Sequence, residues 1–276
     1  MTRPNPSRVR LRYTKFGKIR FTSHRDMARV WERTLRRIDM PVAYSEGYNP
    51  RLKLHFGLAL PTGFESDGEF LDIDINPDVV LASSHEAAEA ASSETGSTNR
   101  VLDLELTRSR LDLASPDGIS VVALAQIDRK ELSLQQAVTS CTWEFSTPLD
   151  APALQGIVDS TLAADSLLLD RERKGKKMTD DIRPQILDLQ VVDSGNTGNI
   201  SQRDAMNDGP RLVAELGTQP RALRPAEFLT AIDMPSKETA RVLRTHQWIT
   251  NNDGEPAREP LVAGLPTAAT TKVGAA

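Results

Sequence analysis

The spacing of hydrophobic residues changes twice within residues 7–60, and these changes limit the folds that the chain can adopt. In residues 7–14 apolar and basic residues alternate, as in a strand with one buried face. From residue 24 to residue 38 the apolar residues recur with helical spacing instead, and residues 51–60 return to alternation. Ser23 is a suitable N-cap for the helix. We therefore predict strands that pack against an amphipathic helix.

The rest of the chain extends this pattern to a mixed α+β fold. The first half reads as strand, strand, helix, strand, strand, helix, strand, and the second half repeats much of this plan. That order predicts two ferredoxin-like sandwich units of βαββ type, with antiparallel sheets that carry helices on one face and leave the other free. We predict a basic N-terminal domain over residues 1–130, a second domain over 131–250 and a disordered tail, rich in Ala, Thr, Gly and Pro, over 251–276.

Local patterns place the remaining elements. Residues 76–118 and 193–210 give weak signals and their structure stays open, although Asn76-Pro77-Asp78 has the character of a helix start. The other predicted strands are 19–21, 69–75, 119–125, 141–146, 166–170, 186–192 and 212–216, and the other predicted helices are 151–164 and 225–232.

Positive charge is concentrated at the front of the chain. Residues 1–60 carry fourteen Lys and Arg against four Asp and Glu, a net charge of +10, whereas the remaining residues carry −14 within a total of −4. Such polarity indicates an anionic ligand, or docking of one half of the chain on the other. Charge alone leaves both alternatives open.

The predicted helix separates its apolar residues from its charges. Like-charged neighbours on a helix cost a few tenths of a kcal/mol each, and guanidinium groups suit phosphate because they offer forked donors. An anion-binding face is one interpretation, and a plain solvated face is the other. The five arginines opposite the apolar side are Arg25, Arg29, Arg33, Arg36 and Arg37.

Basic residues also project from the two flanking strands, opposite their apolar sides. If these strands are neighbours they form a basic sheet face, which Asp72 and Asp74 neutralise in part. Tyr44 and Tyr48, in the loop after the helix, are the aromatic residues best placed to stack on bases. The predicted anion-binding or nucleic-acid-binding residues are Arg10, Arg12, Arg20, His24, Arg25, Arg29, Arg33, Tyr48, Asn49, Arg51, Lys53, Arg173, Lys174, Lys176 and Arg183.

The sequence contains no complete catalytic constellation, phosphate loop or dinucleotide fingerprint. His24 and His55 are weak candidates for acid–base chemistry, and a surface or structural role is the alternative for both. Cys141 is the single cysteine, which excludes an internal disulfide, a cysteine-rich zinc site and an iron–sulfur cluster held by this chain alone. We expect no metal and no cofactor. Because no apolar stretch resembles a signal peptide or a membrane span, we expect a cytoplasmic protein.

Several short motifs are similar to those of the radical-SAM-linked protein family, a domain of unknown function. The resemblance is close over residues 7–75 and patchy to about residue 233. It implies the free-standing form, often encoded near ribonuclease E/G and ribosomal protein genes, because the chain lacks the cysteine motif of a radical SAM enzyme. It implies no activity. The motifs are Tyr13-Thr14-Lys15-Phe16-Gly17, Arg20-Phe21-Thr22-Ser23-His24-Arg25-Asp26, Tyr44-Ser45-Glu46-Gly47-Tyr48-Asn49-Pro50-Arg51, Leu58-Ala59-Leu60-Pro61-Thr62-Gly63, Lys174-Gly175-Lys176-Lys177, Asp181-Ile182-Arg183-Pro184 and Arg224-Pro225.

The sequence supports three hypotheses about function. The leading hypothesis is a non-catalytic RNA-binding or accessory protein that presents RNA or a ribosomal substrate to a partner enzyme. The second is an enzyme that processes or modifies RNA and uses His24 or His55. The third is an adaptor for a radical SAM enzyme, or for a ribonuclease-linked or ribosome-linked protein, in which the arginines meet an acidic protein surface.

Overall fold

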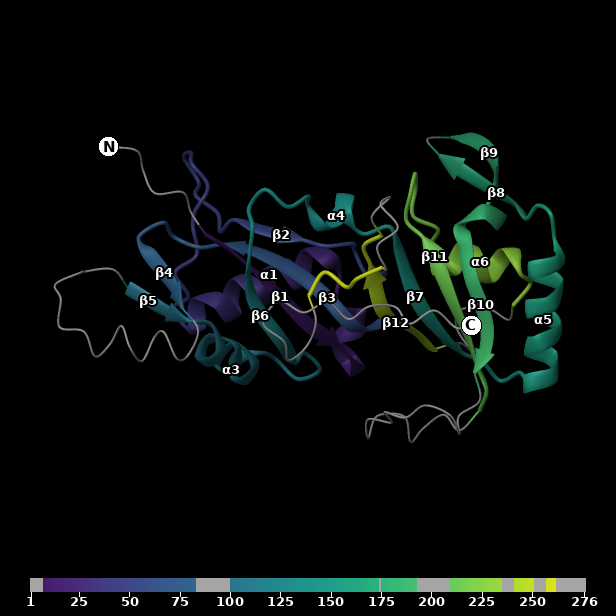
Figure 1. Ribbon diagram of the computed structural model, residues 1–276, viewed down its shortest axis with the longest axis horizontal. Coiled ribbons are helices and arrows are strands. Elements are labelled where there is room, and N and C mark those ends of the chain that lie inside the picture. The colour runs from purple at the N-terminus through teal and green to yellow at the C-terminus, as the bar shows by residue number, and fades with distance from the viewer. Residues whose placement is uncertain are drawn as a thin grey trace. The chain divides into compact units, whose positions relative to one another are not determined.

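The computed structural model is a mixed α+β structure with mostly antiparallel strands (Figure 1). It describes residues 7–82, 100–173, 175–192, 209–234, 241–250 and 257–261. The chain divides into two compact units, one formed by residues 1–137 with 251–276 and the other by residues 138–250. Among the described residues, no helix is long and apolar enough to cross a membrane.

The sheet of the first unit is built around β1. Its strands are β1 (Arg8–Lys15), β2 (Leu54–Phe56), β3 (Glu65–Asp74) and β6 (Val121–Ile127), in the order β2-β3-β1-β6, and each pairs antiparallel with its neighbour. The register places Leu11 of β1 opposite Leu71 of β3 and Leu124 of β6. Alternation in the sequence of β1 thus becomes one apolar face and one charged face.

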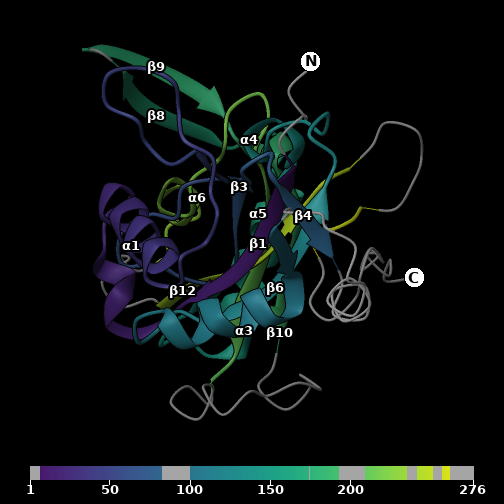
Figure 2. The same cartoon turned by 90° about the vertical axis from the view of Figure 1, so that its left-hand side faces the viewer.

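Helices α1 (His24–Arg37) and α3 (Leu104–Ala114) cover the apolar face (Figure 2). Their buried side chains pack with β1 and β3 in one core. A 3-10 helix, η1 (Gly17–Phe21), joins β1 to α1, and a short helix, α4 (Leu134–Ala137), ends the first of the unit's two segments. Strands β4 (Val79–Ala82) and β5 (Arg100–Asp103) form a separate parallel pair.

Gly118 fixes the turn between α3 and β6. Its φ is +87°, and a Cβ atom there would lie 2.2 Å from the carbonyl oxygen of Phe16. Phe16 in turn donates its backbone N–H to the Gly118 carbonyl at 2.8 Å. This close approach of two backbones requires glycine.

Two local predictions in this unit are wrong. Residues 19–21 belong to η1 and not to a second strand, because the turn at Gly17 has a φ of +67° and continues as 3-10 helix. Residues 76–82 form a turn followed by β4 and not a helix, because Val79 and Ala82 are buried in a strand that pairs with β5. The rest of that predicted helix lies beyond residue 82, outside the described residues.

When the strands of each main sheet segment are counted in chain order, the second unit has the same spatial order as the first: second, third, first, fourth. Its sheet runs β10 (Ile186–Val192), β11 (Arg211–Gly217), β7 (Ser140–Ser146) and β12 (Arg241–Trp248), with antiparallel neighbours.

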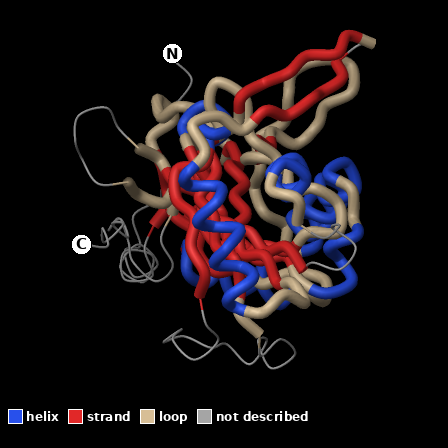
Figure 3. Tube along the Cα trace, turned by 90° about the vertical axis from the view of Figure 1, so that its right-hand side faces the viewer, coloured by secondary structure: helices blue, strands red, loops and turns tan. Residues whose placement is uncertain are grey.

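Helices α5 (Ala151–Ala163) and α6 (Pro225–Ala231) pack on one face of this sheet, and Figure 3 shows α5 lying across the strands. The rings of Phe145 on β7 and Phe228 on α6 are 5.5 Å apart. The antiparallel pair β8 (Leu168–Arg173) and β9 (Lys176–Asp181) is followed by the 3-10 helix η2 (Arg183–Gln185).

The sequence predicted that the second face of the first unit's sheet is free, but this face is covered. Residues 257–261 and α4 lie against it, and Leu261 is buried there with Phe70 and Leu134. These five residues therefore differ from the predicted disordered tail, whereas 251–256 and 262–276 lie outside the described residues. The domain limits 1–130 and 131–250 stay predictions, and the division between compact units falls after Ala137.

Candidate anion-binding surface

Helix α1 is fixed to the sheet by its apolar side. The Ser23 side chain accepts a hydrogen bond from the backbone N–H of Asp26 at 3.2 Å, which caps the first turn. Trp31 is buried, and its ring meets that of Tyr13 on β1 edge to face, with centroids 4.8 Å apart. Anchoring of the buried side leaves the opposite side of the helix to solvent.

Four arginines occupy that exposed side. Arg25, Arg29, Arg33 and Arg36 are all exposed and constitute the α1 stripe. Arg25 and Arg36 are eleven steps of about 1.5 Å apart, which gives the stripe a length of about 16 Å. Arg29 pairs with Asp26 at 3.0 Å, whereas the described residues provide no ion pair for the other three. Arg36 belongs to the stripe although the predicted binding set omitted it.

Arg37 differs from its neighbours on α1. Its Nη1 donates to the carbonyl oxygen of Ala114, the last residue of α3, at 2.8 Å. It therefore ties the two helices together and is not counted in the stripe.

The start of α1 carries two more predicted residues. Arg20 pairs with the buried carboxylate of Glu65 at 3.2 Å and stacks over the exposed ring of Phe21, with 4.7 Å to its centroid. His24 is exposed, and its ring lies edge-on to Phe56 at 5.2 Å. Both residues are thus close to the first turn of α1, where Arg25 begins the stripe.

The loop after α1 holds the remaining predicted residues of the first unit. A bridge between Tyr44 and Leu52 closes it. Tyr48 is fully exposed at its tip, Asn49 and Arg51 are exposed, and Lys53 is half-buried. The loop follows the C-terminal end of α1 in the sequence, whereas His24 is the first residue of the helix.

The charged face of β1 corrects the predicted basic surface. Arg10 is 1% exposed and forms two hydrogen bonds to Asp72, at 2.7 and 2.9 Å. Arg8 bonds to Asp74 at 2.7 Å. Arg12 bonds to Glu259 at 2.8 Å. We name these three pairs the β1 ladder. Its guanidinium groups are directed at carboxylates within the chain and do not form an open surface.

Two carboxyl groups of the ladder have opposite pKa shifts. Burial raises the pKa of Glu259, and the adjacent Arg12 offsets this only in part. Burial also acts to raise the pKa of Asp74, but hydrogen bonds from His55 and Arg8 outweigh it and hold that pKa well below its usual value. At neutral pH the ionised form of Asp74 is thus stabilised by its partners, whereas burial disfavours the ionised form of Glu259.

The two candidate histidines do not meet. His55 lies beside Asp74, with 3.5 Å between Nε2 and Oδ2, on the charged face of the sheet. His24 contacts Phe56, which packs against the core on the helix face. Because neighbouring residues of a strand point to opposite faces, the sheet separates the two rings, and they do not form one site.

In the second unit the structure places one predicted residue firmly. The Arg183 side chain donates to the carbonyl oxygens of Ile186, at 3.3 Å, and Leu162, at 3.1 Å, so it braces the end of α5. Arg173 and Lys176 pair across the β8–β9 hairpin through their backbones. Their side chains, and all of Lys174, lie outside the described residues.

Comparison with protein families places the chain. The DUF2344 family, an uncharacterized protein conserved in bacteria, matches residues 8–97 and 88–213. The chain belongs to this family. No curated protein matches it. The DUF2344 region includes the α1 stripe and all three arginines of the β1 ladder, but Glu259 lies beyond it.

Sequence reasoning missed Glu259 because nothing in its neighbourhood links it to β1. The two residues of the Arg12–Glu259 pair are 247 positions apart. Within the described ranges, no group of three or more His, Cys, Asp or Glu side chains could hold a metal ion.

Proposed function

We propose that this DUF2344 chain is a non-catalytic RNA-binding accessory protein, and that the α1 stripe contacts the phosphate backbone. The observation that supports this is the contrast in pairing: Arg25, Arg33 and Arg36 are exposed and have no ion pair among the described residues. An α-helix gains nothing from like charges along one side, which cost a few tenths of a kcal/mol for each neighbouring pair. An anionic partner would reverse that cost.

The stripe suits a polyanion better than a single small anion. Its guanidinium groups are spread over about 16 Å of helix, so they would meet several phosphates at once. Each guanidinium offers forked donors to phosphate oxygens. Tyr48 and Arg51, exposed in the loop at the far end of the helix, would extend the contact to an unpaired base and a further phosphate.

Binding of single-stranded RNA at low salt tests this proposal. We expect Arg25→Gln/Arg33→Gln/Arg36→Gln to lower the affinity by roughly 100-fold, since each lost charged contact costs about 1 kcal/mol. Lys130→Gln/Arg224→Gln removes exposed charges that do not belong to α1 and serves as the control, with an unchanged affinity. Wild-type protein that shows no RNA binding at low salt would refute the proposal.

We also propose that each unit is ferredoxin-like. In support, both units read strand, helix, strand, strand, helix, strand when the small pairs β4–β5 and β8–β9 are set aside. In both, the sheet order is second, third, first, fourth strand, with antiparallel neighbours. A likeness of fold carries no activity with it.

The family resemblance of the motifs suggests a cytoplasmic partner as well. We propose that the chain works beside a radical SAM enzyme or a ribonuclease-linked or ribosome-linked protein, because the Ser23–Asp26 motif contains Arg25, the first arginine of the α1 stripe. An acidic protein surface is then the alternative ligand for the same arginines. Capture of partners from cell extract, with and without nuclease, separates the two. Loss of the captured material after nuclease treatment supports RNA, and a protein retained after treatment supports the adaptor role.

A further inference from the structure

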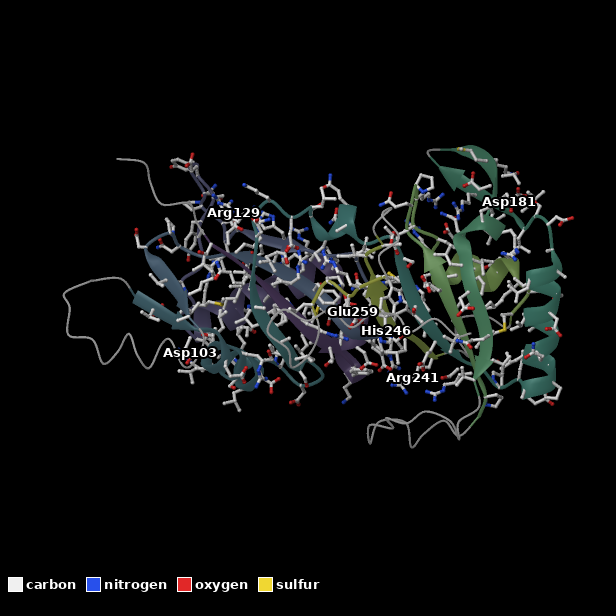
Figure 4. The ribbon with its side chains drawn as sticks, in the orientation of Figure 1. Asp103, Arg129, Asp181, Arg241, His246 and Glu259 are labelled. Atoms are coloured by element: carbon white, nitrogen blue, oxygen red, sulfur yellow. The ribbon has the colours of Figure 1, made fainter. Side chains whose placement is uncertain are left out.

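Residues 257–261 are docked on the charged face of the first unit's sheet. The side chain of Leu261 is buried against Phe70 and Leu134. Backbone carbonyls of the segment accept hydrogen bonds from the β1 ladder: Pro260 from Arg10 and Leu261 from Arg12, both at 3.3 Å. Figure 4 labels Glu259 in this segment. The segment therefore binds by one carboxylate, one apolar side chain and two carbonyl oxygens.

Strand register explains why Arg12 needs a partner from outside the sheet. Arg8 and Arg10 stand opposite Asp74 and Asp72 of β3, but Arg12 stands opposite Phe70. The aromatic ring lies under the guanidinium, with 5.9 Å between Arg12 Cζ and the ring centroid, and supplies no full negative charge. The carboxylate comes from Glu259, which is 4% exposed and lies outside the DUF2344 match.

The Arg12–Glu259 contact is incomplete. Arg10 and Asp72 share two hydrogen bonds, whereas Arg12 and Glu259 share one at 2.8 Å. Among the described residues, the buried atoms Arg12 Nε and Glu259 Oε1 have no hydrogen-bond partner. A buried guanidinium and carboxylate are normally matched in full. The site around Arg12 thus has binding capacity that its present occupant does not use.

We propose that Arg12, Phe70 and Leu134 form a docking site for a short acidic segment with an apolar residue two positions after its carboxylate. The chain's own Glu259-Pro260-Leu261 occupies this site in cis, and a partner protein with a segment of the same chemistry exchanges with it. This site lies on the face of the sheet opposite α1, so it is independent of RNA binding by the stripe.

The neighbours of the site favour a peptide over a nucleic acid. Asp72 and Glu131 lie beside Arg10, and both bond to it. These carboxylates would repel a polyphosphate, whereas a single carboxylate fits Arg12, which has no carboxylate opposite it on β3. The apolar cluster that contacts Leu261 also offers no hydrogen-bond donor or positive charge to a phosphate.

Peptide binding to the full chain tests the exchange. The probe is a fluorescent peptide with the sequence of residues 256–264, PAREPLVAG. Glu259→Gln/Leu261→Ala weakens the segment in cis and opens the site. We expect the peptide to bind this variant saturably and at least about tenfold more tightly than wild type, because a tethered segment competes at millimolar effective concentration. A peptide with Gln in place of Glu should bind at least about tenfold more weakly.

Adding Arg12→Gln to the opened variant should abolish binding. If circular dichroism shows that this protein does not fold, the Gln peptide carries the same test, because it leaves the protein unchanged. Three results would overturn the proposal: no saturable binding to the folded, opened variant, equal binding of the Glu and Gln peptides, or displacement of the peptide by single-stranded RNA from an opened variant that also carries Arg25→Gln/Arg33→Gln/Arg36→Gln. The last result would assign the site to nucleic acid.

Discussion

The arginines of β1 and those of α1 lie within the same thirty residues of sequence but have opposite environments. Arg10 on β1 is 1% exposed and doubly bonded to Asp72, whereas Arg33 on α1 is exposed, and the described residues offer it no ion pair. The difference follows from what lies opposite each face. β3 brings aspartates to β1, while the outer side of α1 faces solvent. Positive charge in a sequence therefore indicates a binding surface only after internal partners have been assigned.

Breaking the β1 ladder is expected to have the largest effect on the free energy of unfolding. Arg10→Ala leaves Asp72 buried without its cation and should destabilise the first unit by about 3–5 kcal/mol. Arg33→Ala should change stability by less than about 0.5 kcal/mol. Urea unfolding followed by Trp31 fluorescence in a Trp143→Phe/Trp248→Phe background reports on this unit alone.

A paired substitution controls for the loss of side-chain volume. Arg10→Met/Asp72→Leu replaces both charges by apolar groups of similar size and should recover most of the stability. Equal losses in the single and double variants would mean that packing, and not the ion pair, holds this position.

The loss of stability in acid also distinguishes the β1 ladder from the α1 stripe. The lowered pKa of Asp74 adds stability above its unfolded-state pKa near 4, and that stability is lost as the pH falls further. We expect a contribution on the order of 2 kcal/mol to disappear between about pH 5 and pH 2 in wild type, and not in Asp74→Asn. Asp26→Asn, at the exposed end of α1, should leave this acid dependence in place. Identical acid curves for wild type and Asp74→Asn would contradict the assignment.

Removal of the N-cap tests the anchoring of the stripe. Ser23→Ala deletes the side-chain acceptor for the Asp26 N–H and should cost about 1 kcal/mol of unfolding free energy. Ser23→Asp retains an acceptor and should lose much less. Hydrogen exchange of the first turn of α1 would locate the change, and faster exchange confined to other elements would argue against it.

The smallest expected effect is on the ion pair within the stripe. Arg29→Ala removes an exposed pair with Asp26 and should alter stability by less than about 0.5 kcal/mol. Thermal melting of the two variants measures this loss, and Arg8→Ala, whose partner Asp74 is buried, should show a clearly larger loss than Arg29→Ala. Similar losses for the two variants would erase the distinction between ladder and stripe.

Local pattern was enough to predict several elements in both units. Alternation located β1 to within one residue, and helical spacing with Ser23 located the start of α1 at His24. Strand β10 was predicted at its observed bounds, 186–192. These elements are amphipathic, so their period alone separates a buried side from an exposed side.

Pairing across long sequence distances could not be predicted in the same way. The burial of Arg10 depends on the register that sets it opposite Asp72, and the burial of Arg12 depends on Glu259, 247 residues away. Residues 19–21 also misled the interpretation, because a short apolar run fits a strand and a 3-10 turn equally well. The sequence therefore located the basic segment correctly but could not tell which arginines are exposed.

The salt dependence of RNA binding tests most directly the claim that the α1 stripe, and not the β1 ladder, is the working surface. For single-stranded RNA, the slope of log K against log salt changes by about 0.7 for each phosphate contact. Arg25→Gln/Arg33→Gln/Arg36→Gln should therefore make the slope shallower by about 2, and the Lys130→Gln/Arg224→Gln control should keep the wild-type slope. A wild-type slope in the α1 variant would contradict the account.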